Sequence, residues 1–222
     1  MAYIYRKQLE EAEIVVVNKC DLVDAPRLAR LRDALAAVAP RAVILECSAR
    51  EGTGLEPWFE RMLAEASRAA AIAEIDYDAY AHGESLLGWL NAEVRVGASA
   101  AAEYDGTTLL VEVMQGVREA LARSGREIAH MKGTLSVEGD PYELAAANLV
   151  RTTDAPAVSH RLAEPIDIGR LLLNLRAEAA PDELEAAVRA ALDAVRPPCE
   201  ILHLEHFRPG RPVPTHRVAA RA

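Results

Sequence analysis

The chain has 222 residues, of which 51% are hydrophobic and 27% are charged, and its formal net charge at pH 7 is −9. This composition is ordinary for folded domains, and the acidic balance argues against nucleic acid as a partner. No apolar run is long enough for a membrane span, and the isolated cysteines favour a reducing, cytoplasmic compartment over a disulfide framework: Cys20, Cys47 and Cys199.

The first residues predict a helix followed by a buried strand. Tyr5, Leu9 and Ala12 are spaced for one helix face, and the β-branched run Ile14–Val17 is typical of a parallel strand. The sequence therefore enters at what resembles the middle of a domain, and it shows no signal peptide.

Two further helices and one strand are predicted up to residue 73. Asp24 is the expected N-cap of a helix with Pro26 in its first turn, and the apolar stripe of that helix is Leu28, Leu31, Leu35 and Val38. A short strand over 42–45 and a helix over 55–70 follow, with these side chains expected on the buried side of the helix: Trp58, Phe59, Met62 and Leu63. Two parallel strands cannot form a covered sheet alone, so we expect partner strands from elsewhere and an apolar surface that favours self-association.

A polar motif follows the first strand directly. Asn18, Lys19 and Asp21 stand at its carboxyl end, where open α/β sheets bind ligands. The Asp21 carboxylate can accept hydrogen bonds from N1–H and the exocyclic amine of guanine, a donor pair that adenine lacks. The Lys19 stem can lie along the purine face, and Asn18 can tie neighbouring loops together.

A second motif follows the strand over 42–45. It places Ser48, Ala49 and Arg50 where a backbone N–H can meet the O6 atom of guanine. Each motif alone is short enough to occur by chance as a polar turn, but two in order, each after an apolar strand, favour base recognition. Together they resemble the guanine-reading part of a P-loop GTPase.

The phosphate-binding part of such a site has no counterpart in these residues. No G-x-x-x-x-G-K-[ST] loop occurs in the sequence. Without its lysine and its magnesium-binding hydroxyl, nothing positions a γ-phosphate, so we expect no GTP hydrolysis by this chain alone.

A composition change over 74–91, rich in Asp, Tyr and Gly, predicts a linker into a second domain over 92–207. That domain begins with an alternating strand, followed by a helix over 107–124 that ends at Gly125. Alternating segments over 127–137, 142–152 and 170–177, a helix over 181–195 and a strand over 200–205 complete it. This order describes a ferredoxin-like α/β sandwich with an extra strand. The last residues, 208–222, form a basic, proline-rich tail.

Beside the two guanine motifs, the strings YRKQLEEAEIVVVNKCDLV, IDYDAYAHGESLLGWLN and HFRPGRPVPTHR resemble the CobW family of GTPases, over nearly the whole chain but only the later part of the family's usual length. The resemblance implies a GTPase domain (1–73), a linker (74–91), a smaller C-terminal α/β domain (92–207) and the tail. It also implies GTP and Mg²⁺ as cofactors, and roles in zinc- or cobalt-type metal homeostasis or insertion into a metalloprotein client. Residue by residue, the base-contacting positions that it implies are Asn18, Lys19, Asp21, Ser48, Ala49 and Arg50. The family's phosphate loop, magnesium carboxylate and Cys-x-x-Cys-type metal motif have no counterpart, so no catalytic or metal-binding residue is assigned.

Other candidate sites are weaker. His203 and His206 lie three apart on a predicted strand, so they should point to opposite faces and cannot share one ion easily. His82, among acidic linker residues, could contribute to a weak metal site, although a solvated linker is the simpler interpretation. The basic tail could lie on an acidic surface or contact a nucleotide phosphate, or remain solvated.

Three hypotheses follow for the function. The chain is the C-terminal portion of a CobW-like GTP-binding protein that needs a P-loop half, or it is a non-catalytic protein-binding module derived from such a GTPase. A third, an RNA-associated GTPase fragment, fits neither the acidic charge nor the lack of clustered aromatic residues.

Overall fold

The computed structural model describes residues 2–64, 86–97 and 102–210, which belong to two compact units. The first unit spans Met1–Gly83 with Pro212–Ala222, and the second spans Glu84–Arg211. The predicted linker over 74–91 lies mostly outside the described residues, and its last four residues belong to a strand of the second unit that begins at Gly88. His82 and its acidic neighbours, and the tail beyond residue 210, also lie outside the described residues.

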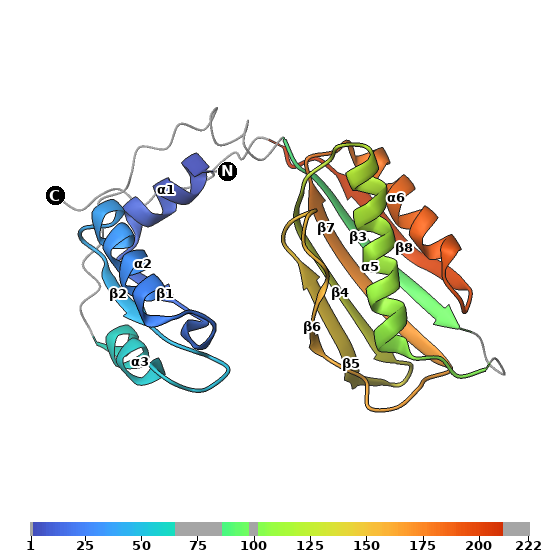
Figure 1. Cartoon of the computed structure of the whole chain (residues 1–222), viewed down its shortest axis with the longest axis horizontal. Helices are drawn as coiled ribbons and strands as arrows, with labels where there is room; N and C mark the ends of the chain where they lie inside the picture. Colours follow the sequence, from blue (N-terminus) through green and yellow to red (C-terminus); the bar gives the residue numbers. More distant parts are fainter. Residues whose placement is uncertain (1, 65–85, 98–101, 211–222) are drawn as a thin grey trace. The chain divides into compact units, whose positions relative to one another are not determined.

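The described part of the first unit contains α1 (Ala2–Glu11), β1 (Ile14–Val17), α2 (Ala25–Val38), β2 (Val43–Glu46) and α3 (Leu55–Leu63) (Figure 1). β1 and β2 pair in parallel, from Ile14 opposite Val43 to Val17 opposite Glu46. Asp24 caps α2 as predicted, because its side chain accepts a 2.7 Å hydrogen bond from the Arg27 backbone N–H. β1 and β2 are half-buried throughout and form a sheet of only two strands within the described residues.

The prediction that α3 buries its apolar side is wrong for this chain. Phe59, Met62 and Leu63 are 50%, 62% and 82% exposed, and Trp58 is half-buried and stacks on Phe59 with ring centroids 5.5 Å apart. A sheet of two strands is too narrow to cover the stripe. The predicted continuation of this helix to residue 70 lies outside the described residues.

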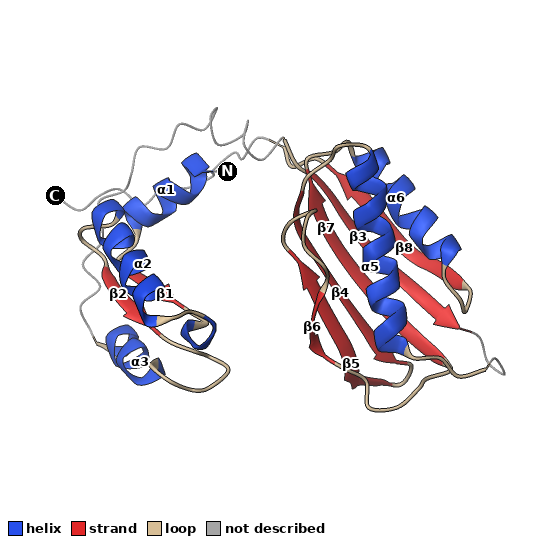
Figure 2. Ribbon diagram, in the orientation of Figure 1, coloured by secondary structure: helices blue, strands red, loops and turns tan. Residues whose placement is uncertain are grey.

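The second unit is a six-stranded sheet in the order β6-β5-β4-β7-β3-β8, with α5 and α6 on one face (Figure 2). All neighbouring strands are antiparallel. The elements are β3 (Gly88–Gly97), α5 (Gly106–Arg123), β4 (Ile128–Val137), β5 (Asp140–Leu149), β6 (Ala157–His160), β7 (Ile168–Ala177), α6 (Pro181–Ala194) and β8 (Cys199–Phe207). α5 ends as predicted, since Gly125 adopts a φ of 67° just beyond it. The strand β6 was not predicted.

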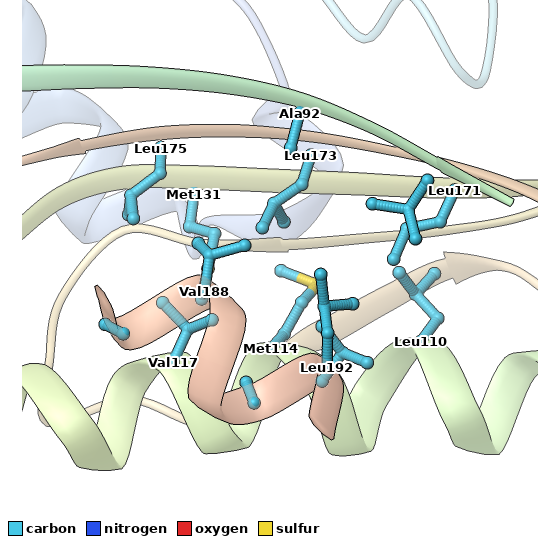
Figure 3. Packing of buried hydrophobic residues seen from close by; sticks show 14 of the residues in the cluster. Ala92, Leu110, Met114, Val117, Met131, Leu171, Leu173, Leu175, Val188 and Leu192 are labelled. Carbon is cyan, nitrogen blue, oxygen red and sulfur yellow. The ribbon is translucent and has the colours of Figure 1, made fainter. Parts of the chain in front are cut away.

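The core of this unit lies between the sheet and its two helices. Alternate residues of β3 and β7 point into it, so that Leu90, Val94, Leu171 and Leu175 are at most 1% exposed. Figure 3 shows side chains of α5 and α6 meeting those of the sheet: Leu110, Met114, Val117, Val188 and Leu192 against Ala92, Met131, Leu171, Leu173 and Leu175. This closed core makes the second unit an α/β structure that is stabilised independently of further strands. Among the described helices, none is long and apolar enough to cross a membrane.

Candidate functional site

The two motif loops leave the same edge of the first unit's sheet because β1 and β2 are parallel. Backbone hydrogen bonds join the loops at their starts: Cys47 N–H donates to Val17 O at 2.9 Å, and Cys20 N–H donates to Cys47 O at 3.1 Å. The Cys20 thiol also donates to Val17 O at 3.1 Å. Both loops are therefore anchored to the carboxyl ends of the strands.

One side-chain oxygen, Asn18 Oδ1, holds the two loops together. It accepts hydrogen bonds from the backbone N–H of Ala49 at 3.0 Å and of Lys19 at 2.7 Å, and the thiol of Cys47 donates to it at 3.7 Å. The residue that sequence analysis expected to tie neighbouring loops does so in the structure. The Ala49 N–H is thereby engaged, so a base oxygen at this point has to share it or use another donor.

Lys19 stands in the left-handed region, with φ of 65° and ψ of 36°. Among the described residues it is the only non-glycine with positive φ. Such a conformation costs of order 1–3 kcal/mol and persists only where surrounding contacts impose it. Here the anchoring bonds of Asn18 and Cys20 supply those contacts, and strain of this kind is concentrated at functional sites.

Asp21 lies in the short 3₁₀ turn Cys20–Leu22 that follows Lys19. Its side chain is exposed and makes no hydrogen bond or ion pair with the described residues. A carboxylate that is unpartnered, at the carboxyl end of a parallel strand and beside a fixed loop can accept paired donors from a ligand.

The second motif divides into buried and exposed residues. Ser48 is 1% exposed, and its Oγ accepts a 3.2 Å hydrogen bond from Glu51 N–H while its own N–H donates to Thr53 O at 3.0 Å. Its side chain therefore shapes the loop. Ala49 and Arg50 are exposed, and Arg50 lies 3.8 Å from the Glu51 carboxylate.

Sequence reasoning did not single out two residues that position this site. Cys47 joins both loops through its backbone and its thiol. Gly54 has a φ of 68°, and a Cβ there would clash with Glu46 O, so the chain can return past the end of β2 only with glycine. The glycines that flank Thr53 in the sequence were the available signal for this second feature.

The set-aside metal candidates remain weak. His203 and His206 pair with Glu93 and Leu90 of β3, which lie on opposite faces of the sheet, so the two rings do not converge. His206 instead contacts Glu185 of α6 at 2.9 Å. Burial raises the pKa of the Cys20 thiol, which disfavours the thiolate that a metal needs. Within the described residues no group of three or more His, Cys, Asp or Glu side chains could hold a metal ion.

Neither a protein-family model nor a curated protein sequence matches this chain. Two solved structures do: the zinc-bound YjiA GTPase from E. coli, at 13% identity, and a zinc-bound triple mutant of the YjiA GTPase, at 14% identity. Each match covers 84% of this chain with a TM-score of 0.30. The chain spans 54% of the length of each of those chains. At so low a TM-score the likeness carries no weight in the argument, which rests on the residues above.

Proposed function

We propose that the first unit is the guanine-recognition part of a GTP-binding site. The single observation that carries the proposal is the bond from Ala49 N–H to Asn18 Oδ1. It joins two independently predicted motif loops and leaves the Asp21 carboxylate exposed beside them. In this site Asp21 reads the N1–H and amine of guanine, Lys19 covers the purine face and Asn18 fixes the loops.

The residues fit the base but not the rest of the nucleotide. No phosphate-binding loop occurs in the sequence, so the chain holds no group that would position a γ-phosphate or its Mg²⁺. No transition-metal ligand set is present among the described residues either. The chain therefore contributes base selection, and the phosphate chemistry has to come from a P-loop-bearing segment or protein.

We further propose that this chain is the C-terminal portion of a CobW-like GTP-binding protein that acts in metal homeostasis or metal insertion. Support comes from the family strings and from the first unit's incomplete sheet, whose strand β1 pairs only with β2 within the described residues. In the second unit the strand order β8-β3-β7-β4, with one helix after β3 and one after β7, supports a ferredoxin-like arrangement extended by β5 and β6. The client and the metal belong to this proposal only through the family resemblance.

The test is to join the chain to the P-loop segment encoded next to it, and to measure GTP and ATP binding by the joined protein. We expect GTP to bind at least tenfold more tightly than ATP, about 1.4 kcal/mol, because only guanine satisfies Asp21. The P-loop segment alone is the control, and it should discriminate poorly between the two bases. Equal binding of both nucleotides by the joined protein, or no binding, would favour the alternative, a non-catalytic module that binds a protein partner.

A further inference from the structure

The second unit carries α5 and α6 on one face of its sheet, and the described residues place no helix on the other, which we call the open face (Figure 2). Strand register sets its rows. One row runs from His130 on β4 through Arg176 on β7 and Trp89 on β3 to Phe207 on β8. In the next row Lys132 lies beside Asn174, which is followed by Asn91 and Glu205. The open face is thus polar and aromatic, in contrast to the apolar face under the helices.

Three basic side chains gather at one end of this face, and we call His130, Lys132 and Arg176 the basic cluster. Lys132 and Arg176 are exposed, and no member of the cluster pairs with a carboxylate among the described residues. Elsewhere on the sheet the arginines are paired: Arg170 lies 2.9 Å from Glu93, and Arg95 lies 3.2 Å from Glu138. In a chain of net charge −9, an unpaired basic cluster is an exception that calls for an anionic partner.

The cluster is held in place by its neighbours. The Arg176 guanidinium lies 3.8 Å over the centre of the Trp89 ring, and that ring packs on Phe207 with centroids 5.8 Å apart. The nearest carboxylate along the adjoining row, Glu205, accepts a 2.7 Å hydrogen bond from Asn91, whose own oxygen accepts one from Asn174 at 2.7 Å. Burial lowers the pKa of His130, and the charges of Arg176 and Lys132 add to this effect. The positive groups are therefore close together and preorganised.

The surroundings of the cluster distinguish between the kinds of anion. One face of Trp89 is covered by Arg176, so the ring is poorly placed to stack on a nucleobase, and the acidic chain lacks the wide basic surface that nucleic acids need. Exposed apolar side chains lie nearby: Leu172 and Phe207 are 45% and 40% exposed on the same face. Mixed apolar and charged contacts of this kind are typical of protein interfaces.

We propose that the basic cluster binds carboxylates of an acidic protein segment, which docks on the open face of the second unit. Arg176 offers a planar pair of donors to one carboxylate, and Lys132 offers a point charge to the next. The proposal is independent of nucleotide recognition in the first unit.

The test uses the full chain and a fluorescein-labelled oligoglutamate peptide, followed by fluorescence anisotropy at low salt. The variant Lys132→Gln with Arg176→Gln should weaken binding by about three- to tenfold, because two exposed charge contacts are lost. The matched control is Arg30→Gln with Arg123→Gln, which removes the same charge from two exposed positions outside the face and should leave affinity unchanged.

Lys132→Gln alone guards against misfolding, since Lys132 contacts no partner among the described residues, and it should weaken binding with an unaltered unfolding midpoint. Equal loss in the control pair, or no loss in the cluster variants, would overturn the proposal. Tighter binding of single-stranded oligothymidylate than of oligoglutamate, lost in the same cluster variants, would also overturn it, because the partner would then be a nucleic acid.

Discussion

Asn18 and Asp21 have different tasks although they are three residues apart. Asn18 uses its oxygen internally, since that atom accepts from Lys19, Ala49 and Cys47. Asp21 keeps both oxygens exposed. A loop that reads a ligand needs both kinds of residue, because a specific contact is useful only when the group that makes it is held in place.

This division predicts the effect of substitutions at Asn18. Asn18→Ala should lower the free energy of unfolding of the first unit by about 0.5–1.5 kcal/mol, since the hydrogen bonds to one exposed oxygen are lost. Asn18→Asp keeps an acceptor for the same donors and should retain most of that stability. Trp58 and Trp89 are the only tryptophans, one in each unit, so urea unfolding followed by fluorescence in a Trp89→Phe background reports on the first unit. Equal stability of Asn18→Ala and the parent would show that the oxygen does not hold the loops.

At the scale of elements, α3 is the clearest sign that the first unit has an unsatisfied surface. Phe59 and Leu63 are four apart on one helix face, and both are largely exposed. Contiguous exposed apolar surface drives association, and the half-buried strands β1 and β2 add unpaired edges to it.

We therefore expect Phe59→Gln with Leu63→Gln to reduce self-association of the chain, measured by sedimentation velocity over a concentration series. Its free energy of unfolding should change by no more than about 0.5 kcal/mol, since exposed side chains contribute little to stability. Leu22→Gln is the matched control, because Leu22 is 72% exposed in the same unit but lies in the 3₁₀ turn. If the parent chain is monomeric, or if the α3 variant and the control behave alike, α3 is not the contact surface.

Most elements could be predicted from local pattern, and the exceptions have physical reasons. β3 alternates buried and half-buried residues along its whole length, and the stripes of α5 and α6 face one core, so the period alone was sufficient. β6 is four residues long and mostly exposed, so it carries no alternation to detect. The exposure of α3 depends on what else covers the sheet, which its own residues cannot specify.

The candidate site was predictable in place but not in detail. A polar motif after an apolar strand locates the loop, because the carboxyl ends of parallel strands share one edge. The left-handed Lys19, the donation of Ala49 N–H to Asn18 and the inward side chain of Ser48 arise from contacts between loops that lie far apart in the sequence. Whether the Lys19 stem and Arg50 contact a base remains a prediction.

At the scale of the whole molecule, the two units differ in how much core each contains. The buried residues described in the first unit are Leu35, Ala39, Cys47 and Ser48, whereas the second unit has a continuous core between its sheet and helices. Stability follows buried apolar surface, so the first unit should open at lower free energy.

Hydrogen exchange measures this difference directly. We expect the backbone amides of β3, β7 and α5 to exchange only through global opening of the second unit, and those of β1 and β2 to exchange much faster through local opening. The comparison has to be made on a demonstrated monomer, because association would protect the first unit. Equally strong protection of both units in that monomer would contradict the incomplete-sheet interpretation.

The central claim is that Asp21 reads guanine, and the most direct measurement is nucleotide preference of Asp21→Asn in the protein joined to its P-loop segment. The substitution replaces one accepting oxygen with a donor, so GTP binding should weaken by about 2–4 kcal/mol, roughly thirty-fold to nearly a thousand-fold. Binding of xanthosine triphosphate should improve, because its C2 carbonyl accepts from the new amide. This exchange of preference cannot arise from unfolding, which weakens both ligands alike. GTP binding equal to that of the parent, or equal loss of both nucleotides, would contradict the assignment of Asp21 as the base-reading carboxylate.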